Sequence, residues 1–285
     1  IYPHWQICIV DDKSTRQETL SYLHGLQDQR IKIVFLEKNQ GIAGASNTAL
    51  ALASGEFIAL MDNDDELTPE ALYEVAKVIN EHDPDLIYSD EDKLTLDGKQ
   101  VEPHFKPDYS PDLLFSMNYI SHLSVYRRNL VEKIGGFRQG YEGSQDYDLV
   151  LRFLDHTHHV YHIPKILYHW RMIPGSTAAS YESKSHAWEA GRAALEDTLK
   201  RRNIQGTAML GNHEGTYRVR RTLLREPKVS IIIPFKDQAT LLRHCLDSIL
   251  EKTTYQNFEI LGVSNNSTDP ATLALMERYQ ARDPR

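Results

Sequence analysis

Residues 57–66 read Phe-Ile-Ala-Leu-Met-Asp-Asn-Asp-Asp-Glu, so that an apolar run ends in a cluster of carboxylates. The run at 57–61 predicts a buried β-strand. Thr68-Pro69 predicts the start of a helix, because Thr caps helix N-termini and Pro suits the first helical turn. The apolar positions between Ala71 and Ile79 fall on one face of that helix. A strand that ends in acids and leads into an amphipathic helix is typical of an α/β sheet.

Strands and helices are expected to alternate on both sides of this stretch. Apolar runs predict further strands at residues 6–10, 31–36 and 85–88, and amphipathic or Ala-rich segments predict helices at 16–29 and 42–53. This alternation predicts an α/β fold with a mostly parallel, doubly wound sheet and helices on both faces. Ligands of such sheets bind at the carboxyl ends of the strands. Asp11-Asp12 and the carboxylates at 62–66 are both expected at that edge.

The middle of the chain departs from this alternation. Three prolines between residues 103 and 111 predict a loop. Beyond it we expect strands at 120–126, 160–163 and 166–170, and helices at 129–134, 144–154 and about 182–202. Residues 192–228 hold nine Lys/Arg and four Asp/Glu, a formal charge of +5. These cations indicate either a solvated helix face and linker, or a patch that faces anionic lipid headgroups or a pyrophosphate-linked acceptor.

The end of the chain repeats its beginning. Residues 255–261 (Tyr-Gln-Asn-Phe-Glu-Ile-Leu) resemble residues 2–8 (Tyr-Pro-His-Trp-Gln-Ile-Cys) at an offset of 253. At the same offset, Ser264-Asn265 stand where the first copy has Asp11-Asp12. An internal repeat indicates that one structural unit occurs more than once.

The repeat defines the expected domains. The second copy starts near Lys228 with a strand at 229–234 and a helix at 241–252, which have no counterpart in the first copy. We therefore expect residues 1–225 to form a domain that lacks its first strand, and residues 226–285 to form the N-terminal part of a second domain. One hypothesis is that residues 229–252 supply the missing strand and helix to the first domain, because its strand edge is otherwise exposed.

Composition restricts the class of protein. With 41% hydrophobic and 25% charged residues the chain has the make-up of a soluble globular protein, and its net charge of −8 argues against general nucleic-acid binding. Cys8 and Cys245 cannot form a disulfide framework, which favours a reducing cytoplasm. No apolar run reaches the roughly 18 residues of a membrane helix, and no signal peptide is recognisable. We expect a cytoplasmic protein whose contact with the inner membrane is at most peripheral.

Asp62-Asn63-Asp64-Asp65 carries the strongest chemical signal. Carboxylates two residues apart on a tight turn can face one cation, and their hard oxygens suit Mg²⁺ or Mn²⁺. Such an ion can bridge a diphosphate and offset the charge of a leaving phosphate. An EF-hand does not fit, because Leu67 stands at the sixth loop position, where Gly is needed. The alternative is an acidic surface loop that caps the next helix.

Two stretches are candidates for nucleotide contacts. Asp11 and Asp12 end the first strand, where a carboxylate can accept the imide N–H of uracil or thymine, or can merely cap a turn. Asn39, Gly41 and Asn47 belong to a stretch of small residues that lets a helix start pass close to a nucleotide, or that packs the helix closely on the sheet. Its spacing differs from the dinucleotide-binding fingerprint.

Two later stretches supply a candidate base and a candidate metal ligand. Asp146 is expected in the first turn of the helix at 144–154, where Ser144 is a candidate cap. A carboxylate at a helix start in a cleft can deprotonate a sugar hydroxyl, although an acid there can also serve only the helix dipole. His169 and Arg171 share one side of the strand at 166–170 by alternation, so they can serve a metal and a diphosphate. The alternative for His169 is a structural role.

In order and spacing over about residues 1–225, these segments resemble family 2 glycosyltransferases of the GT-A fold. The resemblance rests on Val-Asp-Asp-x-Ser at 10–14, Asn-x-Gly-x-Ala-x-x-x-Asn at 39–47, Asp-x-Asp-Asp at 62–65, Gly-Gly-Phe at 135–137, residues 143–149 and Tyr-His-Trp-Arg at 168–171. The stretch Tyr-Ser-Asp-Glu-Asp-Lys at 88–93 resembles a bacterial subgroup with tandem domains that assembles O-antigen, capsule or other surface glycans.

The resemblance implies inverting transfer of a sugar from a UDP- or dTDP-sugar, with dTDP-rhamnose among the candidates, to a glycan or lipid-linked acceptor. It implies that Asp146 is the general base and that Mn²⁺ or Mg²⁺ is the cofactor. By the same resemblance Asp12 reads the base, Asp62 lies by the ribose, Asp64 binds the metal and His169 is a further metal ligand. Asp65 and Arg171 are secondary candidates.

Two other function classes are weighed against an enzyme of this kind. A non-catalytic domain with the same fold could bind a sugar nucleotide or a partner enzyme, but it would not need Asp62, Asp64 and Asp146 together. A nucleotidyltransferase fits poorly, because no Gly-rich loop with a basic residue stands near the chain start. The second copy carries Ser264-Asn265 and ends before any metal motif, so we do not expect a complete active site in it.

Overall fold

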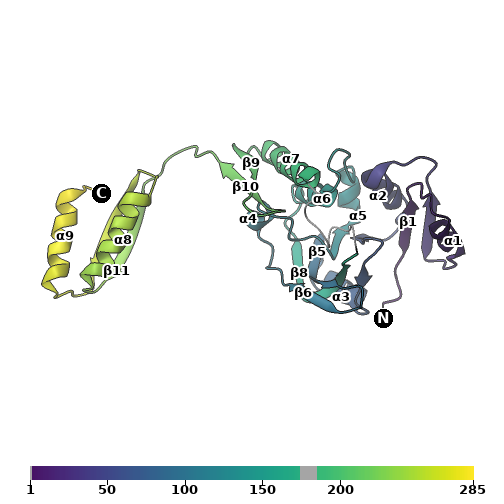
Figure 1. The fold of residues 1–285 in the computed structure, drawn as a ribbon, viewed down its shortest axis with the longest axis horizontal. Helices are drawn as coiled ribbons and strands as arrows, with labels where there is room; N and C mark the ends of the chain where they lie inside the picture. Colours follow the sequence, from purple (N-terminus) through teal and green to yellow (C-terminus); the bar gives the residue numbers. More distant parts are fainter. Residues whose placement is uncertain (1, 174–184) are drawn as a thin grey trace. The chain divides into compact units, whose positions relative to one another are not determined.

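The computed structural model describes residues 2–173 and 185–285 (Figure 1). The chain divides into two compact units, Ile1–Arg221 and Thr222–Arg285. Part of the helix expected at 182–202 therefore lies outside the described residues. Within them, no helix is both long enough and apolar enough to cross a membrane.

The first unit is built on a six-stranded sheet. Its strands follow the order β3-β7-β5-β8-β4, and β6 pairs with β5 outside this path. The strands are β3 (Phe57–Leu60), β4 (Glu66–Leu67), β5 (Leu86–Leu94), β6 (Gln100–His104), β7 (Ser124–Arg127) and β8 (Val160–Arg171).

This sheet is mixed, whereas the sequence predicted a mostly parallel one. Within it β5 and β8 run parallel, and the remaining pairs are antiparallel. A parallel neighbour needs a long crossover connection. β5 and β6 are joined by a short turn at residues 95–99, and β7 lies antiparallel between β3 and β5. The alternation of the first 90 residues carries no information about β7, which comes later in the chain.

A single strand, β8, replaces the two short strands expected at 160–163 and 166–170. Its pairing with β5 passes from Ser89↔Ile163 directly to Asp90↔Ile166, which leaves Pro164 and Lys165 unmatched. Proline has no N–H to donate to a sheet, so the ladder continues past it through a bulge.

A separate parallel pair stands at the start of the first unit. β1 (Ile7–Asp11) pairs with β2 (Ile31–Phe35), with Ile7 opposite Ile31. The helices here are α1 (Gln17–Gly25) and α2 (Gly41–Leu52), and α2 packs against β1. Within the described residues β1 pairs with β2 alone and β3 with β7 alone.

The remaining helices of the first unit enclose its apolar core. They are α3 (Ala71–His82), α4 (Pro111–Leu114), α5 (Arg128–Lys133), α6 (Gln145–Phe153) and α7 (Ser185–Arg201). α6 and α7 lie side by side (Figure 1), and α7 also packs on the hairpin of β9 (Gly206–Leu210) and β10 (Tyr217–Arg221). Leu149, Val150 and Phe153 of α6 are fully buried in the core. The core thereby fixes the first turn of α6.

The second unit is small and contains a second parallel pair. It comprises β11 (Val229–Phe235), α8 (Ala239–Lys252), β12 (Phe258–Ser264) and α9 (Pro270–Arg282), with Val229 opposite Phe258. Its core is formed by Leu242, Leu275 and Tyr279. The hypothesis that residues 229–252 complete the sheet of the first unit is not what the structure shows for β11, which pairs with β12 inside its own unit.

Candidate active site

One cavity of about 1310 Å³ lies in the first unit. Its walls come from segments far apart in the sequence. They include β1 and β3, the facing sides of α2 and α3, the loop that precedes β7, the start of α6 and the turn between β9 and β10. Asp62, Asp64 and Asp146 all line it, so the fold brings the proposed metal turn and the proposed base to one space.

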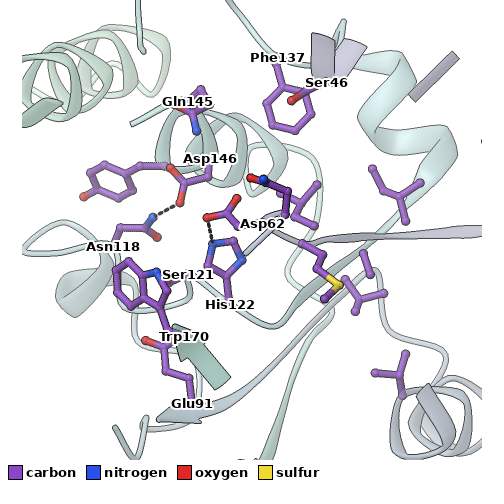
Figure 2. Close-up of a pocket in the computed structure, with 18 of the residues that line it drawn as sticks. Ser46, Asp62, Glu91, Asn118, Ser121, His122, Phe137, Gln145, Asp146 and Trp170 are labelled. Carbon is purple, nitrogen blue, oxygen red and sulfur yellow. Dashed lines mark hydrogen bonds and ion pairs between the residues drawn. The ribbon is translucent and has the colours of Figure 1, made fainter. Parts of the chain in front are cut away.

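The acidic turn follows directly from β3. Asp62 and Asp64 line the cavity, and the backbone N–H of Asp62 donates to the Tyr168 hydroxyl at 3.2 Å. The Asp62 carboxylate points toward His122, whose Nε2 lies 3.6 Å from Oδ2 (Figure 2). The end of strand β8 thus holds the backbone of the turn, while Asp62 and Asp64 stay on the cavity side.

Asp65 and Arg171 shape this turn from behind. The buried Asp65 carboxylate accepts hydrogen bonds from the Tyr168 hydroxyl and, at 2.8 Å, from the Arg171 backbone N–H. Burial raises the pKa of Asp65, although the two hydrogen bonds oppose this rise. The Arg171 side chain donates from Nε to the Asp64 carbonyl at 2.8 Å and pairs with Glu66. Both residues act as scaffold in this structure, and neither is among those lining the cavity in the described part of the chain.

The hydrogen-bond partners of the His169 ring lie outside the acidic turn. His169 is buried, its Nδ1 bonds the Asp92 carboxylate, and its Nε2 lies 3.1 Å from Gln100 Nε2. Among residues 2–173 and 185–285 no group of three or more His, Cys, Asp and Glu is arranged to hold a metal ion. The candidate ligands that do reach the cavity are Asp62 and Asp64, two hard carboxylates on one turn, which fits Mn²⁺ or Mg²⁺.

Asp146 occupies the first turn of α6. Asn118 Nδ2 donates to its Oδ2 at 2.8 Å (Figure 2). Burial raises the pKa of the Asp146 carboxyl, the nearby His122 opposes this rise, and the charge of Asp62 adds to it. Ser144 does not cap the helix with its side chain, because its hydroxyl donates to the Ala187 carbonyl at 2.7 Å.

A second acid in the same turn has a different environment. Asp148 is fully buried and forms ion pairs with Arg138 and, at 2.9 Å, with Arg152. Arg152 also donates to the carbonyls of Ile134 and Gly136, so this acid fastens α6 to the loop after α5. Of the two acids, Asp146 is the one available to a ligand.

Asn118 and His122 are functional candidates that the sequence analysis missed. They lie in the loop before β7, where a strand from residue 120 was expected, and the strand begins only at Ser124. The His122 ring stacks on Tyr168 with centroids 4.7 Å apart. No periodicity or motif spacing distinguishes these two residues, so their place in the site could not be predicted from the sequence.

A buried lysine anchors this loop to the central strand. Lys106 Nζ donates to Glu91 Oε2 at 3.2 Å and to the carbonyls of Ile120 and His122 at 2.8 and 2.6 Å. Asp90 also accepts from the Lys106 backbone N–H and pairs with His162. The acidic stretch of β5 is therefore a buried ionic framework that sets the position of His122.

The proposed nucleotide residues at the end of β1 form a cluster of their own. Asp12 Oδ1 accepts from the Gln40 N–H at 2.6 Å, and Asn39 Nδ2 donates to the Asp12 carbonyl at 3.0 Å. Gly41, at the start of α2, has a φ of 72°, which suits glycine. Asp11 accepts from the Ser14 N–H at 3.1 Å. These bonds join the end of β1 to the start of α2, beside the cavity-lining residues rather than among them.

Asn47 fastens α2 to a glycine turn. Its amide both donates to the Phe137 carbonyl and accepts from the Phe137 N–H, each at 2.8 Å. Gly136 has a φ of 66°, and a Cβ there would lie 2.4 Å from Asn47 Oδ1. The Gly-Gly-Phe segment is thus required for this contact, and both hydrogen-bonding ends of the Asn47 amide are engaged in it.

Comparison with known proteins gives a family match. The model of glycosyl transferase family 2 matches residues 1–135 and 230–285. An uncharacterized protein, y4gI, of Sinorhizobium fredii is 43% identical over all of this chain and 32% of its own length. The O-antigen biosynthesis protein RfbC of Myxococcus xanthus is 38% identical over all of this chain and 22% of its own length. The chain thus spans about a third or less of these relatives.

Solved structures with the same fold include two bound to sugar nucleotides. S. aureus TarS 1-349 in complex with UDP-GlcNAc is 21% identical, with a TM-score of 0.54 over 70% of this chain and 59% of that one. The mannosyltransferase PcManGT of Pyrobaculum calidifontis, in complex with GDP-Man and Mn²⁺, is 14% identical, with a TM-score of 0.51 over 68% and 55%. At these identities the similarity establishes the fold, which is the expected GT-A fold.

Proposed function

Since the chain belongs to glycosyl transferase family 2, we propose that its first unit transfers a sugar from a nucleotide-diphosphate donor to a hydroxyl of a glycan or lipid-linked acceptor in bacterial surface polysaccharide synthesis. The observation that carries this proposal is that Asp62, Asp64 and Asp146 line the same cavity. A carboxylate turn suited to a metal and a carboxylate suited to a base are what such a transfer needs.

The proposed reaction is an inverting displacement. The acceptor oxygen attacks the anomeric carbon from the face opposite the diphosphate, and Asp146 takes the proton of that hydroxyl. The bond from the anomeric carbon to the diphosphate breaks, and its electron pair leaves with the diphosphate. The raised pKa of Asp146 supports this role, because a base is more effective when its pKa approaches the working pH.

The proposed metal binds at Asp62 and Asp64. When bound, Mn²⁺ or Mg²⁺ would offset the negative charge on the leaving diphosphate. The protein's own contribution is to hold the two carboxylates on one turn, with its backbone fixed by Tyr168 and Arg171. His169 stays a weaker candidate, because Asp92 and Gln100 engage both of its ring nitrogens.

The proposed donor is a UDP- or dTDP-sugar. Support comes from Asp12 at the carboxyl end of β1, where a carboxylate could accept the imide N–H of a pyrimidine. Asp11, Asn39, Gly41 and Asn47 would then act chiefly by fixing the strand end and the helix start, as their hydrogen bonds indicate. A peripheral contact with the membrane that carries a lipid-linked acceptor belongs to the same proposal.

We also propose that residues 1–225 are the catalytic domain and residues 226–285 the start of a second copy. The match of the family model to both residues 1–135 and residues 230–285 supports this organisation, as does the sequence repeat. The catalytic carboxylates named above all belong to the first of these domains.

The decisive experiment measures nucleotide binding and turnover together. Calorimetry should show binding of UDP or dTDP that depends on Mn²⁺ and that is lost in Asp64→Ala. The same protein should turn over a UDP- or dTDP-sugar, and Asp146→Asn should stop this turnover without loss of binding. Binding without turnover in the parent protein would instead favour a non-catalytic binding domain. A folded parent protein that neither binds a nucleotide nor turns over a sugar nucleotide would contradict the proposal.

A further inference from the structure

We propose that Asn118 is the positioning residue of the base, and that its free amide oxygen binds a second hydroxyl of the acceptor sugar beside the reacting one. This inference rests on the proposed function. It concerns a residue of the loop before β7, for which neither the sequence motifs nor the comparisons suggest a role.

The hydrogen bond between the two side chains sets the geometry. Asp146 Oδ2 lies 2.8 Å from Asn118 Nδ2. An ionised carboxylate can only accept, so the NH₂ end of the Asn118 amide must face it. This bond fixes the carboxylate at the first turn of α6 and leaves its other oxygen for the hydroxyl that reacts. In the described chain, Asn118 is the only side chain that donates to Asp146.

The same bond decides what the other end of the amide does. With Nδ2 facing Asp146, Asn118 Oδ1 is an acceptor, and it is buried with no hydrogen-bond partner among the described residues. A buried acceptor without a donor costs stability, which a ligand's O–H or N–H group can restore. Because Asn118 lines the cavity, that donor can come from a bound molecule.

The surrounding groups favour a polyhydroxyl ligand at this wall. His122 Nδ1, four residues along the same loop, is also buried without a partner among the described residues. His122 and Ser121 line the cavity next to Asn118, and the Asp62 carboxylate lies beside His122, 3.6 Å from its Nε2 (Figure 2). Two unpartnered polar atoms on the loop that carries the base's hydrogen-bond donor suit a sugar with hydroxyls on adjacent carbons. One hydroxyl would donate to Asp146 and react, and its neighbour would donate to Asn118 Oδ1.

The test compares Asn118→Leu, which keeps the side chain's size but removes both functions of the amide, with Asn118→Gln, which keeps both. Asn129→Leu makes the same chemical change on α5, away from the cavity. Circular dichroism establishes folding of each variant. Hydrolysis of a UDP- or dTDP-sugar, with water in place of the acceptor, supplies a kinetic readout that requires no known acceptor.

We expect Asn118→Leu to lower kcat for hydrolysis by about tenfold and to move the acid limb of its pH profile upward by about one pH unit, because the charged carboxylate loses a donor. KM for the donor and the affinity for UDP should stay within twofold. Asn118→Gln should recover part of kcat and of the pH shift, and Asn129→Leu should match the parent. Unchanged kcat and pH profile in a folded Asn118→Leu protein would overturn the proposal.

A second measurement separates this inference from the proposed function. In protein labelled with ¹³C at the aspartate carboxyls, the Asp146 signal is assigned by its absence in Asp146→Asn. Its midpoint of titration should rise in Asn118→Leu even if no sugar nucleotide is turned over. A rise without turnover in the parent would contradict the proposed enzyme but keep the positioning bond. An unchanged midpoint would contradict the positioning bond itself.

The acceptor contact has its own readout. If a methyl glycoside serves as acceptor, its analogue lacking the hydroxyl next to the reacting one should lose about tenfold in kcat/KM with the parent protein. With Asn118→Leu, kcat/KM should be nearly the same for the acceptor and for its analogue, because this variant already lacks the contact to that hydroxyl. Equal losses in both proteins would show that Asn118 does not bind that hydroxyl.

Discussion

The two units contain the same strand with different partners. β12 in the second unit corresponds to β1 in the first at the repeat offset of 253. β12 pairs in parallel with β11, the strand that precedes it, whereas β1 pairs in parallel with β2, the strand that follows it. Each unit thus shows one of the two neighbours that a central parallel strand can have. The comparison indicates that β1 can take a second parallel partner on the side where β12 has β11.

The two copies also differ in the chemistry at the end of this strand. The first copy ends in Asp11-Asp12, whose carboxylates accept from the backbone N–H groups of Ser14 and Gln40. The second copy ends in Ser264-Asn265. The loop after it is held by Asp237, whose carboxylate accepts from the backbone N–H groups of Thr268 and Asp269. A common backbone is therefore held by different acids. The acidic turn and the candidate base described above follow the first copy.

The largest effect should come from a single carboxyl of the first unit. If that unit alone is catalytic, Asp146→Asn should lower sugar transfer or donor hydrolysis by about 10²- to 10⁴-fold, because the amide cannot accept the proton. Affinity for UDP, measured by calorimetry, should be unchanged. Activity that survives in a folded Asp146→Asn protein would place the base elsewhere.

The parent protein should show the corresponding pH dependence. Because burial raises the pKa of Asp146, the carboxylate is protonated at a higher pH than an ordinary aspartate. Activity should therefore fall, as pH is lowered, at a pH above the usual range of Asp near 3.8. A rate profile across the acid range checks this, and an acid limb at or below the usual value would contradict the assignment.

The next effect tests the metal turn of the first unit against the polar strand end of the second unit. Asp64→Asn should weaken Mn²⁺-dependent UDP binding by at least about tenfold, since it removes a charged oxygen ligand. Ser264→Ala is the control, because it alters a polar strand end of the second unit at the position that corresponds to Asp11. Calorimetry should find its UDP affinity equal to that of the parent. An equal loss of UDP affinity in the two variants would contradict the assignment of the metal site to the first unit.

A smaller effect should follow from supplying a strand to β1. A synthetic peptide with the sequence of residues 226–237, which contains β11, should bind between β1 and β3, where both strands line the cavity. At a peptide concentration ten times the Kd the expected stabilisation is about 1.4 kcal/mol, or a rise in Tm of a few degrees. Hydrogen exchange should slow at β1 and β3. A peptide of scrambled sequence should have no effect, and equal effects of both peptides would contradict the comparison.

The smallest expected effect is on stability. Asp146 has a raised pKa in the folded state, so the folded protein binds its proton more tightly than the unfolded chain, and stability falls as pH rises from the unfolded pKa through the folded one. Asp146→Asn should therefore be slightly more stable than the parent at neutral pH and should lose this advantage in acid. Thermal unfolding at pH 7 and pH 4 checks the sign, and a lower Tm at pH 7 would contradict it.

Much of the fold could be predicted because local signals and the final packing agree. The apolar run at 57–61 becomes β3, and the amphipathic segment after it becomes α3. The GT-A fold expected from ordered motifs is confirmed by the structural neighbours. The mixed character of the sheet was not predictable in the same way, because the position of β7 between β3 and β5 depends on pairings distant in sequence.

The site was predictable where residue type and position fix the chemistry. Asp62, Asp64 and Asp146 do meet in one cavity. Strand alternation could not show that Asp92 and Gln100 engage the nitrogens of His169, or that Arg171 holds the backbone of the acidic turn, since both depend on neighbouring strands. Asn118 and His122 lie in an irregular loop. Buried Lys106 holds this loop at the carbonyls of Ile120 and His122, and no local sequence pattern predicts that contact.

The cavity has a thermodynamic consequence because it is one space from β1 to α6. A strand bound beside β1 and β3 and a nucleotide bound near Asp62 and Asp64 would contact the same walls. If the strand changes the affinity for the nucleotide by some factor, the nucleotide must change the affinity for the strand by the same factor. Completion of the sheet and loading of the donor would then be linked equilibria, and the sugar nucleotide would act as a folding ligand for the domain.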